Sequence, residues 1–154
     1  MTIIKTVSTN SPEETIEMGA RLGAGLDAGD FVALMGDLGA GKTMFVKGVA
    51  KGLGIEDYLY VNSPSFVILK EYKGNKNLYH FDVYRLSEEG FCDTLDYRRY
   101  FYGDGISVVE WADKITDELP EEYLEVGITY GEGMEREFNF RAVGERFEGI
   151  VGEI

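Results

Sequence analysis

The sequence of 154 residues has one cysteine, Cys92, and one histidine, His80. A single cysteine excludes an intramolecular disulfide and argues against a cysteine-based metal site, and one histidine cannot form a histidine cluster. Residues 1–5 lack the apolar core of a signal peptide, and no apolar run in the sequence approaches the length that spans a membrane. We therefore expect a cytoplasmic protein with reduced thiol chemistry.

Positive charge is also scarce. Lys and Arg total 15 against 28 Asp and Glu, which gives a formal net charge of −13, and the longest basic run is Arg98-Arg99. Nonspecific affinity for nucleic acid comes mainly from Lys and Arg that neutralise phosphates. We therefore expect no direct binding of nucleic acid by this chain alone, so a partner would have to hold any RNA.

The apolar segments predict one folded domain over residues 1–154. The sequence is 44% hydrophobic and 13% aromatic, which is typical of a globular chain with a core. Residues 30–35 form a nearly continuous apolar run, as a buried parallel strand requires. Residues 43–53 predict a helix closed by Gly54. Its apolar face has i/i+3/i+4 spacing and consists of Phe45, Val46, Val49, Ala50 and Leu53.

Further elements follow from capping, alternation and turn signals. A capping motif at residues 11–14 predicts a helix to about residue 27, with Ile16, Ala20, Gly23 and Leu26 buried. Strands are expected at residues 3–7 and 106–109, and an irregular helix at residues 87–101, interrupted by Gly90. Two hairpins are expected, one from residues 66–72 and 78–83 and the other from residues 124–130 and 138–142. These elements predict a three-layer α/β fold of the P-loop NTPase type, with parallel core strands extended by antiparallel strands.

Residues 36–43, G-D-L-G-A-G-K-T, match the phosphate-binding pattern G-x-x-x-x-G-K-[ST]. The glycines let successive N–H groups point at phosphate oxygens, Lys42 adds a charge near the β- and γ-phosphates, and the Thr43 hydroxyl can bind Mg²⁺. The order strand, loop, helix places the phosphates at a helix N-terminus. The predicted nucleotide-binding residues here are Gly36, Asp37, Leu38, Gly39, Ala40, Gly41, Lys42, Thr43 and Met44.

Two acidic residues at strand ends are candidates for the rest of the site. Asp82 follows an apolar and aromatic run 40 residues after Lys42, where a phosphate loop needs an acid for Mg²⁺. Glu110 ends the strand at residues 106–109, on the edge where α/β sheets bind ligands. It could polarise the attacking water or hold an Mg²⁺-bound water. We predict Lys42 and Glu110 as catalytic and Thr43, Asp82 and Glu110 as metal-binding, although either acid could simply face solvent.

Three further features have more than one interpretation. Trp111, the single tryptophan, could stack on the base, anchor a protein interface or belong to the core. The S-P-S-F segment at residues 63–66 is either a switch that reaches the γ-phosphate and Mg²⁺ or an ordinary turn. We include Ser65 and Trp111 among the nucleotide-binding candidates. His80 is more often a plain strand residue than a catalytic one.

The motifs G-D-L-G-A-G-K-T, S-P-S-F, H-F-D-V-Y-R-L and V-E-W, in this order, resemble the TsaE (YjeE) family. The resemblance covers about the first 120 residues. It implies a small bacterial P-loop ATPase that is weakly active alone and binds ATP or ADP with Mg²⁺. The family is required for making N6-threonylcarbamoyladenosine in tRNA, and its partner is the TsaD–TsaB heterodimer, which transfers the threonylcarbamoyl group to the adenosine next to the anticodon.

The resemblance also implies roles for individual residues. Lys42 and Thr43 match the family's phosphate-loop residues, Asp82 its magnesium aspartate, and Glu110 with Trp111 its E-W pair. One departure is Ser65, where the family usually has threonine. Serine keeps the hydroxyl needed for metal contact, and the lost methyl group is expected to loosen the segment.

Two other classes of P-loop protein, and a scaffold without turnover, are alternatives. A small-molecule kinase needs a mobile lid with arginines that clamp the phosphoryl group, but the chain has only seven arginines and no cluster after the central strands. A guanine-reading GTPase typically has N-K-x-D, and the nearest string, N-K-N-L at residues 75–78, lacks the aspartate. A nucleotide-dependent scaffold without hydrolysis stays open, and the function of Glu110 decides that case.

Overall fold

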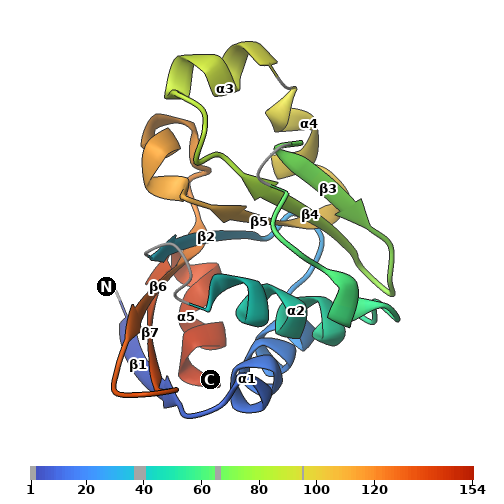
Figure 1. The fold of residues 1–154 in the computed structure, drawn as a ribbon. Coiled ribbons are helices and arrows are strands. Elements are labelled where there is room, and N and C mark those ends of the chain that lie inside the picture. The colour runs from blue at the N-terminus through green and yellow to red at the C-terminus, as the bar shows by residue number, and fades with distance from the viewer. Residues whose placement is uncertain (1–2, 37–40, 65–66, 95) are drawn as a thin grey trace.

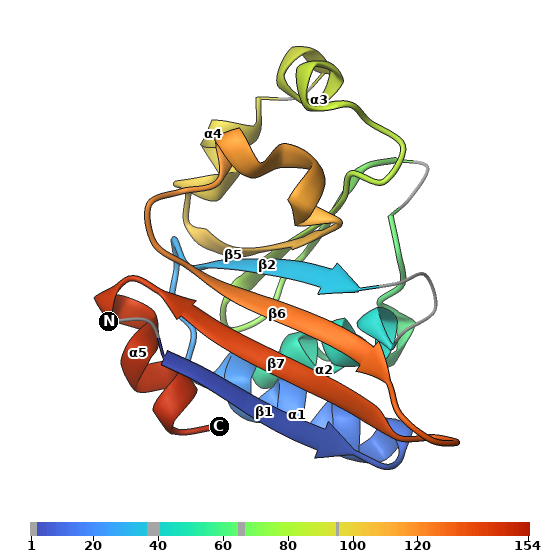
Figure 2. The ribbon, with the colours of Figure 1, turned by 90° about the vertical axis from the view of Figure 1, so that its left-hand side faces the viewer.

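The computed structural model describes residues 3–36, 41–64, 67–94 and 96–154, in which a seven-stranded sheet has helices on both faces (Figures 1 and 2). The strand order is β1-β7-β6-β2-β5-β4-β3. The elements, with η for 3₁₀ helices, are β1 (Ile3–Thr9), α1 (Pro12–Ala24), β2 (Phe31–Gly36), α2 (Lys42–Gly52), η1 (Tyr58–Tyr60), β3 (Leu69–Tyr72), β4 (Asn77–Asp82), α3 (Glu88–Thr94), α4 (Tyr97–Phe101), β5 (Gly105–Glu110), η2 (Ala112–Glu118), β6 (Tyr123–Tyr130), β7 (Arg136–Val143) and α5 (Glu145–Gly152).

The centre of the sheet is parallel and its edges are antiparallel. Strand β2 pairs in parallel with β5 and β6, and β4 pairs in parallel with β5. Every residue of β5 is buried, as expected for a strand covered on both faces. The β3–β4 and β6–β7 hairpins and β1 add antiparallel pairs. The predicted fold, a parallel core extended by antiparallel strands, is therefore confirmed.

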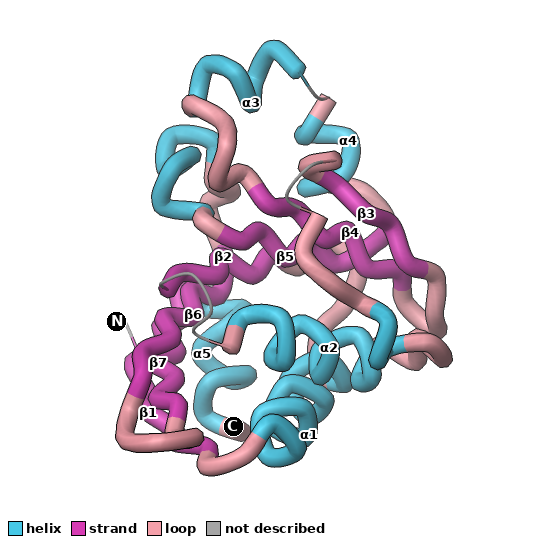
Figure 3. Tube along the Cα trace, in the orientation of Figure 1, coloured by secondary structure: helices cyan, strands magenta, loops and turns pink. Residues whose placement is uncertain are grey.

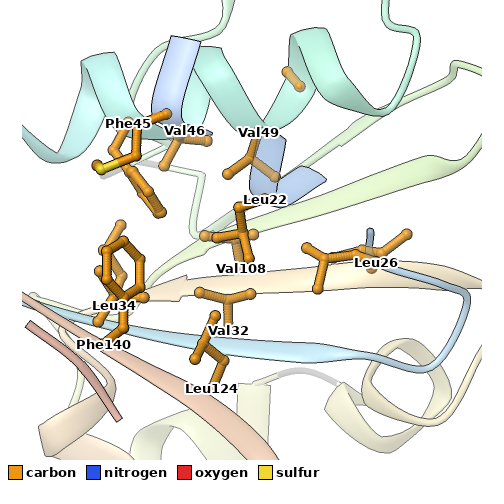
Figure 4. Close-up of a cluster of buried hydrophobic side chains, with 14 of the residues drawn as sticks. Leu22, Leu26, Val32, Leu34, Phe45, Val46, Val49, Val108, Leu124 and Phe140 are labelled. Atoms are coloured by element: carbon orange, nitrogen blue, oxygen red, sulfur yellow. The ribbon is translucent and has the colours of Figure 1, made fainter. Parts of the chain in front are cut away.

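Helices α1, α2 and α5 lie on one face of the sheet, and α3 and α4 lie on the other (Figure 3). Between α2 and the sheet, apolar side chains from both layers interlock (Figure 4). All five residues predicted for the apolar face of α2 are buried. Burial of this face fixes the rotation of α2 and therefore the direction in which its first turn points.

Glycines bring α1 and α2 into backbone contact. A Cβ atom on Gly48 would lie 2.3 Å from the carbonyl oxygen of Ile16, and one on Gly23 would lie 2.4 Å from that of Val49. These contacts advance in the same direction along both helices, so α1 and α2 run parallel and their N-termini lie at the same end. The N-termini of α1 and α2 therefore lie beside each other on one face of the sheet.

The predicted buried residues of α1 and its C-terminal extension were right for Gly23 and Leu26 and wrong for Ile16 and Ala20. The buried residues in the helix are Thr15, Met18, Gly19, Leu22 and Gly23, whereas Ile16 and Ala20 are only partly buried. The reason is the glycine contact, because it turns the backbone of Ile16 and Ala20 toward α2 instead of placing their side chains in the core. The helix also ends at Ala24 rather than near residue 27.

The second face of the sheet has a largely aromatic core that includes Phe31, Phe81 and Phe101. The helix expected at residues 87–101 is two helices, and the prediction that Gly90 interrupts it was wrong. Gly90 lies in the first turn of α3, where its N–H donates to the Oγ of Ser87 at 3.0 Å. The break instead separates α3 from α4. Strand β3 is also shorter than expected, because residues 67 and 68 form a turn in which the Ile68 N–H donates to the Pro64 carbonyl.

Candidate functional site

A cavity of about 340 Å³ opens at the carboxyl ends of β4 and β5, where the N-termini of α1 and α2 meet. It collects seven of the residues predicted for the site, which are Gly41, Lys42, Thr43, Met44, Asp82, Glu110 and Trp111. Gly36 ends β2 and contacts Lys42. The predictions for Asp37, Leu38, Gly39, Ala40 and Ser65 fall outside the described residues. Segments far apart in the sequence therefore meet at one cavity.

The first turn of α2 forms one wall of this cavity. Gly41 is the N-cap residue and has φ 96°, a left-handed conformation that a side chain would strain. Among the described residues, no side chain caps the N-terminus of α2. The first N–H groups of a helix lack intrahelical partners, and the helix dipole favours negative charge beside them. This end of α2 is consequently suited to an anion such as a phosphate.

Lys42 lies between the end of β2 and Trp111. The residue is 4% exposed, and its Nζ donates to the carbonyl oxygen of Gly36 at 3.0 Å. The same Nζ lies 3.8 Å from the centre of the Trp111 ring, close enough for a cation–π interaction. These contacts hold the ammonium group at the phosphate-loop end of the cavity.

Trp111 has an unusual backbone conformation. Its φ is 64°, a left-handed value that is uncommon outside glycine, and its N–H donates to the Leu34 carbonyl at 3.0 Å. The indole packs against the aromatic core and against the Tyr84 ring, with the two ring centres 4.8 Å apart. Trp111 also lines the cavity. Trp111 therefore packs against the core with part of its side chain and lines the cavity with the rest.

Asp82 and Glu110 are register partners on the adjacent parallel strands β4 and β5. Their exposed fractions are 5% and 3%. The Oδ2 of Asp82 accepts from the Ser63 hydroxyl at 2.7 Å, and its Oδ1 accepts from the Tyr84 N–H at 2.9 Å. Glu110 Oε2 lies 2.5 Å from His80 Nε2. Buried carboxylates need such partners, and these contacts fix both acids at the cavity edge.

The connector before Ser63, which includes Leu59 and Val61, is bound to α2 through Lys47. Lys47 Nζ donates to the carbonyls of Leu59 at 2.6 Å and Val61 at 2.5 Å, and burial lowers the pKa of this lysine. The segment is thereby fixed just before the S-P-S-F motif. Its first residue, Ser63, lies in the cavity wall, and this much of the motif belongs to the site.

The cavity wall offers oxygen ligands for a divalent cation. The hydroxyls of Thr43 and Ser63 and the carboxylates of Asp82 and Glu110 all line it. Among the described residues, no group of three or more His, Cys, Asp or Glu side chains is arranged to hold a metal by itself. Mg²⁺ is usually bound by one or two carboxylates together with substrate phosphates and water. The donor set fits that mode of binding better than an all-protein metal site.

Sequence reasoning missed five residues of the cavity wall. They are Ser11, Pro12 and Thr15 at the start of α1, and Met134 and Arg136 at the β6–β7 hairpin. The Arg136 Cγ lies 3.6 Å from the position of a Cβ on Gly41, and its guanidinium donates to the Glu135 carbonyl at 2.8 Å. The Ser11 motif was visible, but only as a helix cap. Nothing in the local pattern around Arg136 indicates that β7 brings it to the phosphate loop.

Comparison with known proteins identifies the family. A family model described as "Threonylcarbamoyl adenosine biosynthesis protein TsaE" matches residues 9–138. The Bacillus subtilis (strain 168) tRNA threonylcarbamoyladenosine biosynthesis protein TsaE is 46% identical over 147 residues, which cover 95% of this chain and 90% of the relative. The Treponema pallidum (strain Nichols) protein of the same name is 44% identical, covering 73% of this chain and 82% of its own.

A solved structure agrees with these sequence relatives. The crystal structure of Bacillus subtilis YdiB has a TM-score of 0.83 to this chain at 40% sequence identity, covering 99% of this chain and 95% of that one. In the part of the chain that the structure describes, no helix has the length and apolar character needed to cross a membrane. The resemblance in the sequence motifs is confirmed, and the chain belongs to the TsaE family.

Proposed function

We propose that the chain is an Mg²⁺-dependent ATPase that acts with a TsaD–TsaB complex in the biosynthesis of N6-threonylcarbamoyladenosine in tRNA. The observation that carries the proposal is the meeting of Lys42, Asp82 and Glu110 at one cavity beside the N-terminus of α2, which no described side chain caps. Phosphate-transfer sites need this combination of anion binding, metal ligands and a group that orients water. The names of the relatives support the pathway.

The cavity has two ends that suit the two parts of a nucleotide. Residues 36–44 and Lys42 in particular would bind the phosphates of ATP or ADP. The nucleoside would extend toward the start of α1 and the hairpin, where Pro12, Met134 and the Arg136 side chain offer apolar and planar surface. Because Trp111 contacts the ammonium of Lys42, we assign its ring to the phosphate end rather than to the base.

Thr43, Asp82 and Glu110 would hold Mg²⁺, directly or through water. The metal neutralises charge on the phosphate oxygens when bound. Asp82 is fixed by Ser63 and the Tyr84 N–H, so its carboxylate is preorganised at this position. Glu110 uses Oε2 for the contact with His80, so Oε1 would be the oxygen that orients the attacking water.

The kinase alternative has less support. A kinase needs a second substrate site and several arginines around the transferred group. Within the described residues, Arg136 is the one arginine in the cavity wall, and its guanidinium is bonded to carbonyls of its own hairpin. Hydrolysis by a site that acts on a partner fits this arrangement better. The −13 charge supports the same division of labour, with the partner holding the tRNA.

The proposal is tested first by nucleotide binding. Wild-type protein is expected to bind ATP in an Mg²⁺-dependent manner, to prefer it to GTP and to hydrolyse it slowly. Lys42→Ala is expected to weaken ATP binding by about 10-fold or more, because hydrogen bonds to charged groups contribute roughly 1.5–3 kcal/mol. Isothermal titration calorimetry with ATP, ADP and GTP, with and without Mg²⁺, measures these affinities.

Lys73→Ala is the matched control, since Lys73 is exposed in the β3–β4 turn and does not line the cavity. It should bind ATP as the wild type does. Equal ATP affinity of the Lys42→Ala and wild-type proteins, or a clear preference for GTP, contradicts the proposed adenine nucleotide site.

The proposed partnership predicts nucleotide-dependent association. ATP should strengthen binding to purified TsaD–TsaB by about 10-fold relative to ADP, within the range of typical coupling between two sites. TsaD–TsaB should in turn raise the ATPase rate. Trp111→Ala should largely remove the effect of ATP on partner affinity while the protein stays folded. The reason is that the indole links Lys42 to the end of β5. A pull-down under ATP, ADP and no nucleotide, with a parallel ATPase assay, measures both effects.

A gel shift with tRNA and the isolated chain is the accompanying control, and it should show no complex at physiological salt. Association that ignores the nucleotide, together with unstimulated hydrolysis, contradicts the coupling. Tight tRNA binding by the isolated chain contradicts the division of labour.

A further inference from the structure

His80 is the one histidine of the chain, and it lies beneath the cavity rather than in its wall. Its side chain is 0% exposed. On one side, Nε2 lies 2.5 Å from Oε2 of Glu110. On the other side, Nδ1 is buried and has no hydrogen-bond partner among the residues that the structure describes. A histidine that served only to fill the core would not need this contact with a buried acid.

The two nitrogens decide where the imidazole proton lies. A proton on Nδ1 would be a buried donor without an acceptor, which is unfavourable. A proton on Nε2 is donated to the carboxylate of Glu110. Within the described part of the chain, Nδ1 also meets no group to which the imidazole could pass a proton onward, so the contact is suited to holding Glu110 rather than to relaying protons away from it.

We propose that His80 is the positioning residue for Glu110. The Nε2–H of His80 fixes Oε2 of Glu110, so that Oε1 faces the attacking water; this role rests on the ATPase activity proposed above. Glutamate has three side-chain torsions, and a fixed donor restricts them before substrate arrives. His80 acts through Glu110 and touches neither nucleotide nor water.

The sheet gives this pair its rigidity. His80 pairs with Val108 and Asp82 pairs with Glu110 on the adjacent central strands β4 and β5. Residues two apart on a strand share a face, so His80 lies on the same face of the sheet as Asp82 and Glu110. Its register partner Val108 is two residues before Glu110 on β5. Strands paired on both sides move little relative to one another, and the geometry of the hydrogen bond is therefore set by the core of the fold.

The test compares variants that remove or keep the donor. His80→Phe keeps a ring of similar size but has no N–H, and we expect its kcat for ATP hydrolysis to fall by about 10- to 100-fold, as for loss of other outer-shell partners. The Kd for ATP should stay within about 2-fold, because Lys42 and the α2 N-terminus are untouched. His80→Gln should keep most of the wild-type rate. The side-chain amide nitrogen of glutamine lies as many bonds from Cα as the Nε2 of histidine does, so it can still donate to Glu110.

A double-variant cycle separates positioning from a structural role. If His80 acts through Glu110, His80→Phe should lower the single-turnover rate in the wild-type background but not in the Glu110→Gln background. An equal fold-loss in both backgrounds overturns the proposal, as does a wild-type kcat for His80→Phe. Should His80→Phe fail to fold, His80→Gln and His80→Asn replace it. Only the Gln side chain reaches Glu110, so equal rates for these two overturn the proposal.

Tyr79→Phe is the matched control on the same strand. It removes a hydrogen bond from Tyr79 to Asp104, at 2.7 Å, on the opposite face of β4. Its kcat should equal that of the wild type, and a loss as large as that of His80→Phe overturns the proposal by showing that any change in β4 suffices. Wild-type protein that hydrolyses no ATP, alone or with TsaD–TsaB, contradicts the proposed function itself. Hydrolysis that is insensitive to His80→Phe contradicts only the positioning role.

Discussion

Glu110→Gln is expected to lower the ATPase rate by about 100-fold or more while ATP affinity changes little, the range for loss of a general base or water-orienting group. Glutamine has nearly the same shape, so the buried end of β5, where Glu110 is 3% exposed, should keep its packing. The amide cannot accept a proton from water as a carboxylate can. Single-turnover hydrolysis and calorimetry, measured on the same preparations, separate the rate from the affinity.

Glu56→Gln is the control for this prediction, because Glu56 is an exposed residue before η1 and outside the cavity wall. It makes the same chemical change and should leave the rate unaltered. If Glu110→Gln hydrolyses ATP at the wild-type rate, the assigned role of Glu110 is wrong. A wild type that binds ATP without hydrolysing it, even with partners, favours the scaffold alternative.

Gly48→Ala is expected to destabilise the protein by about 2–3 kcal/mol, the upper part of the range for overpacking a core. The new Cβ would lie 2.3 Å from the Ile16 carbonyl oxygen and 3.0 Å from the Cα of Gly19. Both neighbours are backbone atoms, so neither can turn aside and the helices must separate. For a chain of this size the unfolding temperature should fall by about 5–10 °C. Thermal unfolding followed by circular dichroism measures it.

Gly149→Ala supplies a control with the opposite sign. Gly149 is also helical, in α5, but a Cβ there would meet nothing within 4 Å. Alanine should stabilise this helix by up to about 1 kcal/mol through its higher helix propensity. Two glycine-to-alanine changes should thus move the unfolding temperature in opposite directions. An unchanged temperature for Gly48→Ala contradicts the close contact of α1 and α2.

The parts predicted from the sequence were those with strong local signals. Strands β2 and β5 have continuous apolar runs, and α2 has a clear apolar face directly after the phosphate-loop motif. The meeting of Asp82 with Glu110 followed from a general rule, because the carboxyl ends of parallel strands lie at one edge of the sheet. For these residues, chain order and strand direction were sufficient to place the side chains together.

The parts that were missed depend on contacts between distant segments. The buried face of α1 is set by its glycine contact with α2, which no pattern within α1 reveals. Helix α5 is short and contains two glycines, so its propensity signal is weak although Phe147 and Val151 are buried. Arg136 reaches the cavity only because β7 pairs with β6, whose neighbour β2 leads into the phosphate loop. Such positions follow from the assembled sheet.

The position of Trp111 gives the protein an intrinsic optical probe. It is the single tryptophan among ten tyrosines and nine phenylalanines, so emission excited at the red edge of the protein spectrum comes from this indole alone. The ring lies 3.8 Å from the Lys42 ammonium, and a nearby cation shifts indole emission. We therefore expect a nucleotide phosphate that draws Lys42 away from the ring to change this emission. Rapid mixing with ATP or ADP can follow binding and release in unlabelled protein, with no background from any other tryptophan.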